Sequence, residues 1–225
     1  MSKSAKRKGK VEEEEKKRAK GKAVAKGRLI ALDGTKGHEL EQGAEHLVHL
    51  LSRTNGEAGW SQWDASNTFY ELRLGKSKHH APPPRTLVLL YASDLLFRLR
   101  WEIRPALAEG HTVVAAPYLE TAIGFGVASG LSLDWLQGLF SFAPKADASF
   151  RLKESKKFKE KAKGNKSPSG FVEFCFNRLA ANHPNWDTPE VYTAMRDYLD
   201  TLEEKEEIRR LGKKLPKSLS KVSSR

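Results

Sequence analysis

A short glycine-containing loop is the first candidate for chemistry in this sequence. The apolar run at residues 29–32 leads into Asp33 and then into GTKGH at residues 34–38, where a helical pattern begins. The backbone N–H groups of such a loop, together with the positive end of the helix dipole, attract anions. The candidate phosphate-binding loop therefore comprises Gly34, Thr35, Lys36, Gly37 and His38.

The loop lacks the Gly-Lys-Ser/Thr sequence that normally completes a phosphate-binding loop. Those three positions hold Glu39, Leu40 and Glu41. A glutamate repels phosphate where a lysine attracts it, and Leu40 belongs to an apolar helical stripe that should face the core. One interpretation is a turn with a structural role only, since its glycines suit turn geometry. The alternative is that Lys36 folds back over the loop and binds phosphate.

Short apolar strands and amphipathic helices alternate along the rest of the chain. Strands are expected at residues 29–32, 60–63, 112–116 and 148–152. Helices are expected at residues 38–53, 68–74, 86–107, 121–129, 133–142, 171–182 and 188–210. Continuous apolar runs are typical of strands buried on both faces, and strands that alternate with helices favour a parallel sheet. The sequence therefore predicts an α/β fold with right-handed crossovers.

Charge separates a folded region from two tails. The net charge is +12, but residues 1–28 carry 12 Lys and Arg against four Glu, and residues 208–225 carry seven basic residues and no acid. The predicted organisation is a tail, a domain, a lid-like basic segment within that domain and a second tail, at residues 1–27, 28–207, 153–169 and 208–225. Blocks of like charge are usually solvated and disordered, and contact with nucleic acid or an acidic protein is the alternative.

The remaining composition excludes several classes of protein. The single cysteine, Cys175, rules out an internal disulfide framework and fits a reducing cytoplasm. No apolar run approaches the roughly 18–20 residues that a membrane-spanning helix needs, and the basic N-terminal residues lack the apolar segment of a secretory signal. The adjacent His79 and His80 lack the spacing of metal ligands, so no metal site is predicted. We therefore expect a cytoplasmic protein without membrane contact.

One segment in the middle of the chain carries a family resemblance. IRPALAEGHTVVAAPY at residues 103–118 resembles the thymidylate kinase pattern Ile-x-Pro-Ala-Leu-x-x-Gly-x-x-Val-Val/Ile-x-Asp-Arg-Tyr. Similar segments occur in family order at residues 90–94, 118–125, 130–135 and 144–152, so the resemblance covers approximately residues 27–207. It implies a three-layer, P-loop NTPase-like fold with a parallel sheet of about five strands flanked by helices, commonly in a homodimer. It also implies transfer of the terminal phosphoryl group of ATP to dTMP, with Mg²⁺.

The resemblance implies an acceptor pocket as well as a phosphate loop. Its candidate residues are Arg73, Asp94, Arg98, Tyr118, Thr121 and Phe125. Asp94 matches the family pattern, and Arg98 lies one helical turn beyond it, where it is placed to compensate for a missing arginine. Phe125 stands where the family has an aromatic residue that stacks on the base. Structural alternatives remain open: Asp94 as a helix cap, Phe125 as a core residue and Arg73 as a surface residue.

The sequence departs from the family where charge must hold the transferring phosphoryl group. Ala116 and Pro117 replace the Asp-Arg pair, and Leu95 replaces the acceptor arginine. QWDASNT at residues 62–68 replaces the family's Arg-Glu-Pro-Gly-Gly-Thr loop, and a lysine-rich segment at residues 153–166 replaces the arginine-bearing lid. Neither alanine nor proline can coordinate Mg²⁺ or bind phosphate through its side chain, and lysine lacks the bidentate fork of arginine.

Three hypotheses follow. The first is a thymidylate kinase-like pseudoenzyme in which phosphoryl transfer is impaired or lost, with at most weak binding of dTMP or ATP. The second is a divergent, active dTMP or nucleoside monophosphate kinase that uses ATP and Mg²⁺ and rebuilds the site with Lys36, Arg98 and lysines of the lid-like segment. Lys36 and Arg98 are its catalytic candidates. The third is an interaction protein that binds nucleic acid or an acidic partner through its basic tails. The missing charges favour the first, because catalysis of phosphoryl transfer is mostly positioning and charge stabilisation.

Overall fold

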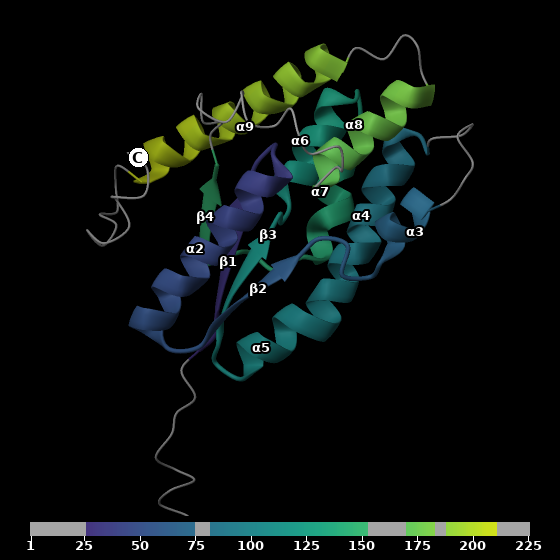
Figure 1. Ribbon diagram of the computed structural model, residues 1–225. Helices are drawn as coiled ribbons and strands as arrows, with labels where there is room; N and C mark the ends of the chain where they lie inside the picture. The colour runs from purple at the N-terminus through teal and green to yellow at the C-terminus, as the bar shows by residue number, and fades with distance from the viewer. Residues whose placement is uncertain (1–25, 75–81, 153–169, 183–187, 211–225) are drawn as a thin grey trace, which may run out of the picture.

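The computed structural model describes residues 26–74, 82–152, 170–182 and 188–210. Within them, four parallel strands form one sheet in the spatial order β2-β3-β1-β4 (Figure 1). The strands are β1 (Arg28–Asp33), β2 (Ala58–Gln62), β3 (Thr112–Ala116) and β4 (Ala148–Arg151). The predicted parallel α/β fold is confirmed. The expected number of about five strands is too high for the described residues, because every described segment after β4 is helical.

Helices connect the strands and cover the sheet. In chain order they are α2 (Gly37–Asn55), α3 (Thr68–Leu74), α4 (Pro84–Arg98), η1 (Leu99–Ile103), α5 (Arg104–Ala108), α6 (Glu120–Ala128), α7 (Leu133–Leu139), η2 (Phe140–Phe142), α8 (Phe171–Asn182) and α9 (Thr188–Arg210). The predicted lid-like segment at residues 153–169 lies outside the described residues. So do the predicted tails, apart from residues 26–27 and 208–210.

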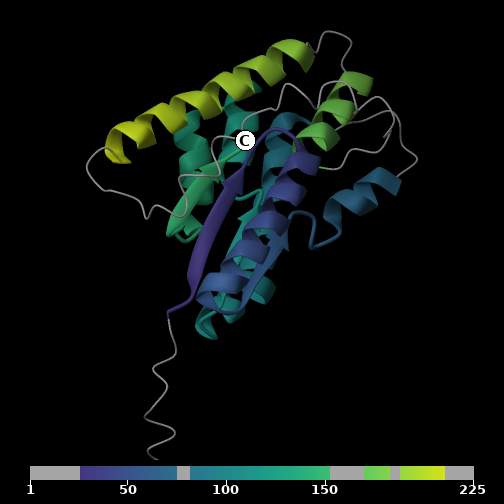
Figure 2. The same ribbon diagram turned by 60° about the vertical axis from the view of Figure 1, so that its left-hand side comes forward.

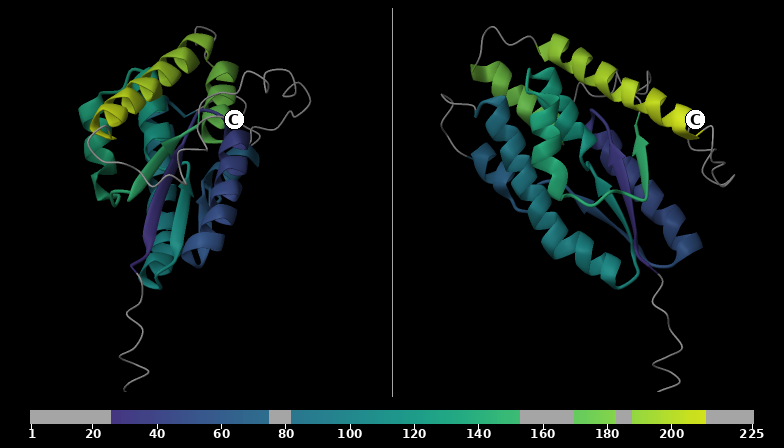
Figure 3. Two further views of the ribbon diagram at one scale, coloured as in Figure 1. Left: turned by 90° about the vertical axis from the view of Figure 1, so that its left-hand side faces the viewer. Right: turned by 180° about the vertical axis from the view of Figure 1, so that it is seen from behind.

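The sheet is buried on both faces, which explains why its central strands are apolar throughout. Alternate side chains of β1 and β3 pack against α2 in a cluster of Ile30, Leu32, Val114, Ala116, Leu40, Ala44, Leu47 and Leu51. The intervening side chains, Leu29, Ala31, Val113 and Ala115, join a larger cluster with residues of α4, α6, α8 and α9. Figure 3 shows the three resulting layers, with α2 on one side of the sheet and α4 and α6 on the other.

The long helical segment predicted at residues 86–107 is divided by a wider turn. A π-helical turn, η1, separates α4 from α5, and Arg104 N–H donates to the Leu99 carbonyl five residues earlier. Pro105 explains this change, because proline lacks an N–H and its ring would clash with the carbonyl four residues before it. A proline near the end of a helix is typical of a kink or an early stop. The three segments together cover one side of the sheet (Figure 3).

The carboxyl ends of the four parallel strands meet at one edge of the sheet. β1 ends there, and α2 runs back alongside it after a short loop (Figure 2). Helix α9 crosses the molecule at the same end in Figures 1 and 2. In open parallel sheets, ligands bind outside the carboxyl ends of the strands. A ligand site of this fold is therefore expected at this edge, beside the candidate loop.

Candidate functional site

The candidate phosphate-binding loop lies between β1 and α2, and a buried carboxylate anchors it. Asp33, the last residue of β1, is 1% exposed. Its Oδ1 accepts hydrogen bonds from the N–H of Tyr118 at 3.0 Å and from the N–H and hydroxyl of Thr121 at 3.0 and 2.7 Å. Burial raises the pKa of Asp33, and these hydrogen bonds oppose that shift. Gly34 N–H donates to Thr121 Oγ1 at 3.1 Å, so Thr121 ties the loop to the start of α6.

Leu40 stands where a phosphate-binding loop normally has its lysine. Its side chain is 4% exposed and packs with Leu32, Ala44 and Leu47 between the sheet and α2, as its helical stripe predicted. A leucine in this position cannot attract phosphate, and its burial leaves the space above the loop without the usual cation. His38, two residues earlier, is exposed.

The loop is covered by the two C-terminal helices of the same chain. Gly37 N–H, at the start of α2, donates to Glu173 Oε1 of α8 at 2.8 Å. The hydroxyls of Thr35 and of Tyr192 in α9 lie 2.8 Å apart. Lys36 Nζ lies 5.8 Å from the centre of the Tyr192 ring. Three polar groups of the loop and the start of α2 therefore contact α8 or α9.

Arg98, a candidate for both catalysis and acceptor binding, is fully buried in the scaffold. It is 0% exposed. Its Nε donates to Ser61 Oγ at 2.9 Å, its Nη2 to the Ser61 carbonyl at 2.7 Å and its Nη1 to the Pro117 carbonyl at 2.9 Å. The guanidinium thus joins the end of β2 to the turn after β3. The structure places Arg98 as a structural link, and its functional roles stay predictions.

Asp94 organises the loop that follows β2. It is 0% exposed and accepts the N–H groups of Asp64 and Ser66, both at 2.9 Å, and the Ser66 hydroxyl at 2.8 Å. Asp64 in turn accepts the Phe69 N–H at 2.7 Å at the start of α3. These bonds hold the segment in which the predicted acceptor loop would lie. Arg73 belongs to α3, and its side chain lies outside the described residues.

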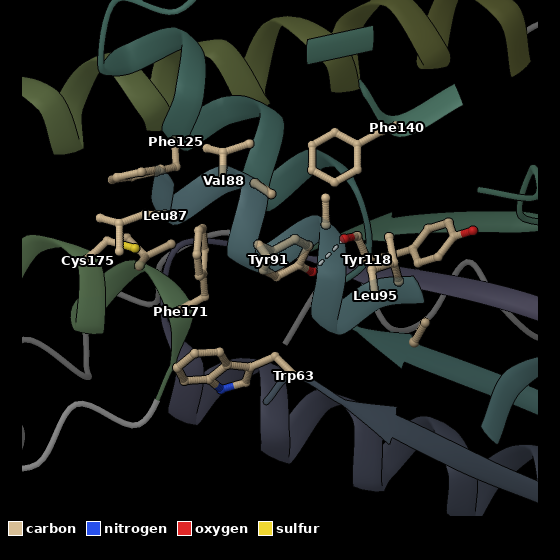
Figure 4. Close-up of a cluster of buried hydrophobic side chains, with 14 of the residues drawn as sticks. Trp63, Leu87, Val88, Tyr91, Leu95, Tyr118, Phe125, Phe140, Phe171 and Cys175 are labelled. Carbon is tan, nitrogen blue, oxygen red and sulfur yellow. Dashed lines mark hydrogen bonds between the residues drawn. The ribbon is translucent and has the colours of Figure 1, made fainter. Parts of the chain in front are cut away.

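The other acceptor candidates also pack in the interior. Tyr118 is 2% exposed, and its hydroxyl donates to a backbone carbonyl before β4 at 2.6 Å. Phe125 is 0% exposed, and its ring centre lies 5.5 Å from that of Phe171 in α8. The ring centre of Phe171 also lies 4.6 Å from that of Tyr91 and 6.2 Å from that of Trp63. Figure 4 shows the Phe171 ring among these side chains. An aromatic side chain of the chain itself therefore contacts the ring predicted to stack on a base.

The residues at this edge do not fit Mg²⁺ and a triphosphate. Glu41, in the usual Ser/Thr position, accepts a hydrogen bond from Gln62 Nε2 at 3.0 Å, and burial raises the pKa of Glu41. Ala116 and Pro117, at the end of β3, offer neither a carboxylate nor a guanidinium. Over the described ranges, no group of three or more His, Cys, Asp and Glu side chains could hold a metal ion. The described residues at this edge therefore supply neither the loop lysine nor the metal ligands that hold Mg²⁺ and a triphosphate.

A cavity of about 550 Å³ lies at the other end of β1. It is lined by Lys26, Gly27, Leu29, Leu107, Ala108, Pro144, Lys145 and Asp147. Asp147 accepts the Leu29 N–H at 2.8 Å and so belongs to the scaffold. None of the loop residues or acceptor candidates lines this cavity.

Sequence reasoning missed the residues that close the loop. Glu173 lies in FVEFCF, which reads as a buried aromatic run, and the only signal was one carboxylate in an otherwise apolar helical turn. Tyr192 gives no signal, because its partner Thr35 is 157 residues away in the chain. Asp33 was interpreted only as part of a turn, although a buried acid at the end of a strand needs hydrogen-bond donors.

Comparisons with known proteins point to one group of enzymes. No family model matches the chain. A probable thymidylate kinase of Pyrococcus abyssi is 40% identical over 83 residues, which is 35% of this chain and 40% of that protein. Probable thymidylate kinase 2 of Saccharolobus solfataricus is 26% identical over 128 residues, 57% of this chain and 60% of that protein. The chain thus matches less than two thirds of the length of either relative.

A solved structure shares the fold. The thymidylate kinase from Ehrlichia chaffeensis superposes with a TM-score of 0.57 at 14% sequence identity, covering 80% of this chain and 87% of that one. At this identity the likeness demonstrates a common arrangement of strands and helices.

Proposed function

This chain is related to the thymidylate kinases, as its sequence predicted, and from that premise we propose that it is a member in which phosphoryl transfer is impaired or lost. The observation that carries this proposal is the burial of Leu40 in the position of the loop lysine. The chain keeps the strand, the loop and the helix of a phosphate site but puts an apolar side chain where the cation belongs.

Phosphoryl transfer depends on positive charge that is positioned before the reaction. In this chain the nearest loop cation, Lys36, lies against the Tyr192 ring, and the buried Arg98 donates to Ser61 and Pro117. Glu41 adds negative charge beside the loop. Removal of a single group that stabilises the transition state commonly lowers the rate about 10²- to 10³-fold, and such losses are not additive. With several groups replaced, we expect little activity of the ancestral kind.

A single-turnover assay with the full chain, ATP, Mg²⁺ and dTMP tests this proposal. The expected result is no transfer above the rate without protein. Transfer that disappears in Lys36→Ala but persists in Lys145→Ala would establish the divergent kinase instead. Lys145 is a suitable control because it is an exposed lysine at the far end of β1.

A second part of the proposal concerns the location of the protein and its oligomeric state. We propose a cytoplasmic homodimer, and none of the helices in the described ranges is long and apolar enough to cross a membrane. Support for a dimer comes from exposed apolar side chains on α4 and η1, namely Leu89, Leu96, Phe97 and Trp101. Light scattering of the full chain, compared with Trp101→Glu, would measure this assembly.

A second candidate function is binding of nucleic acid or an acidic protein by the tails. It rests on the seven basic residues and no acid at residues 208–225. Neutralising the lysines at 213, 214, 217 and 221 with glutamine should flatten the salt dependence of binding to single-stranded nucleic acid by about 0.7 in the log–log slope per lost contact. An unchanged slope would show that this tail makes no such contact.

A further inference from the structure

The first turn of helix α8 contacts both the candidate phosphate-binding loop and the predicted acceptor pocket. Glu173 Oε1 accepts the Gly37 N–H of the loop, and two residues earlier the Phe171 ring joins the aromatic cluster beside Phe125. Residues two apart on a helix point in different directions, so one turn can contact the loop with one side chain and the aromatic cluster with another. The approach is close, because a Cβ added to Gly170 would lie 2.6 Å from Gly37 Cα. The start of α8 is therefore seated directly on the loop.

The Glu173 carboxylate occupies a place suited to an anion. The Gly37 N–H belongs to the first turn of α2, where the helix dipole is positive and N–H groups lack partners within the helix. A carboxylate oxygen at 2.8 Å makes a charge-assisted hydrogen bond of the kind that a phosphate oxygen would make. Lys36 adds attraction for the carboxylate, while Glu41 repels it.

The contact between Glu173 and Gly37 requires the burial of a carboxylate, which is electrostatically unfavourable. Glu173 Oε2 is buried and has no hydrogen-bond partner among the described residues. A buried oxygen without a donor destabilises the folded chain, and burial accordingly raises the pKa of Glu173. Its neighbours keep it in place, since Phe171, Phe174 and Cys175 are at most 2% exposed. Burial of these apolar side chains therefore stabilises the position of α8. That position in turn places the Glu173 carboxylate at the loop.

From these contacts we propose that α8 is an internal plug, in which Glu173 occupies the loop as a phosphate would and excludes anions from it. This inference rests on the proposed function and adds how the site is kept closed. The loop itself retains Gly37 N–H and Lys36, so the chemical class it would accept is a phosphate chain. Removing the Glu173 charge should remove the repulsion of anions and leave Lys36 as the nearby cation, and Glu173→Ala should in addition free the Gly37 N–H.

Calorimetric titration of the full chain with sodium tripolyphosphate tests the plug. This probe has no base and needs no metal, so it carries only the phosphate chemistry that the loop would bind. Wild type is compared with Glu173→Gln and Glu173→Ala, and with Glu45→Gln, which removes an exposed glutamate from α2. The titration is run in about 0.3 M NaCl to screen the basic tails, and because all four proteins share those tails, only differences between them are interpreted.

The expected result is at least a tenfold gain in affinity for both Glu173 variants and none for Glu45→Gln. The gain should be lost when Lys36→Ala is added to Glu173→Gln. Equal affinity in all four proteins would overturn the plug, provided that the variants keep the wild-type circular dichroism. Wild-type kinase activity would overturn the proposed function, whereas a failure to gain affinity would overturn only the plug.

The contact itself can be measured without a variant. The Gly37 amide resonance of the wild-type chain should shift with pH as Glu173 titrates, with a midpoint above the ordinary glutamate pKa because burial raises it. Among the described residues, the charges of Lys36 and Glu41 act on the pKa of Glu173, and the Gly37 N–H donates to its carboxylate. A Gly37 amide that does not respond above about pH 4.3, the ordinary glutamate pKa, would show that the carboxylate is not at the loop.

Discussion

In the candidate phosphate-binding loop, Leu40 stands in the position of the usual lysine, whereas in the predicted acceptor pocket Leu95 stands in the arginine position and the nearby Arg98 is buried in the scaffold. The loop joins a buried strand to a helix, and its lysine position holds an apolar side chain. The Arg98 guanidinium donates to Ser61 and to the Pro117 carbonyl. The contrast shows that the residue type at a position can be taken from the sequence, whereas the burial of a neighbouring arginine is visible only in the fold.

The largest effect should come from Arg98→Met. The substitution removes a buried guanidinium and leaves the Ser61 and Pro117 carbonyls without a donor, so we expect a loss of about 3–5 kcal/mol in the free energy of unfolding. Urea denaturation measures the loss. Arg100→Met, on the exposed side of η1, is the matched control and should stay within about 0.5 kcal/mol of wild type. A stable Arg98→Met protein would mean that the arginine is free for a functional role.

A smaller effect is expected where Thr121 joins the loop to α6. Thr121→Val deletes the hydroxyl that donates to Asp33 and accepts the Gly34 N–H, leaving buried polar groups unpaired. We expect a loss of about 1–3 kcal/mol in the free energy of unfolding. The control is Thr54→Val near the end of α2, where the threonine is exposed. Equal losses for the two substitutions would refute the anchoring of the loop by Thr121.

The pH dependence of stability tests the buried carboxylate at the end of β1. Because burial raises the folded-state pKa of Asp33, the folded protein binds its proton more tightly than the unfolded chain does. Stability from this group is therefore fully present below about pH 4 and falls as pH rises towards the raised pKa. The difference in free energy of unfolding between wild type and Asp33→Asn should shift in favour of the variant over this window. A constant difference would contradict the raised pKa.

The smallest effect is expected for Lys36→Ala. The lysine lies over the Tyr192 ring at a partly exposed site, and its loss should lower the free energy of unfolding by about 0.5–1 kcal/mol. A double-mutant cycle with Lys36→Ala, Tyr192→Leu and the double variant isolates the interaction energy between Lys36 and Tyr192. A coupling energy indistinguishable from zero would mean that the Tyr192 ring does not hold Lys36.

Much of the fold followed from local patterns. Apolar runs located β1 and β3, the stripe of Leu40, Ala44 and Leu47 oriented α2, and Pro105 marked the change in the long helix. These signals are local because they depend on strand and helix periodicity and on the chemistry of proline. The expected number of strands exceeds that of the described residues, since it came from resemblance and not from a pattern in the chain.

The site was predicted less completely, for a physical reason. The missing lysine was evident, since it depends on residue type at one position. The fate of Arg98 depends on the Ser61 and Pro117 carbonyls, and that of Gly37 on a carboxylate 136 residues later. Contacts between such distant residues are set by tertiary packing, which no local period encodes.

Calorimetric titration of the full chain with ATP, with and without Mg²⁺ and in the presence of dTMP, tests the central claim most directly. A loop without its cation should give no dissociation constant tighter than about 1 mM and no gain on adding Mg²⁺. Binding of ATP below about 100 µM that requires Mg²⁺ and disappears in Lys36→Ala would contradict the account.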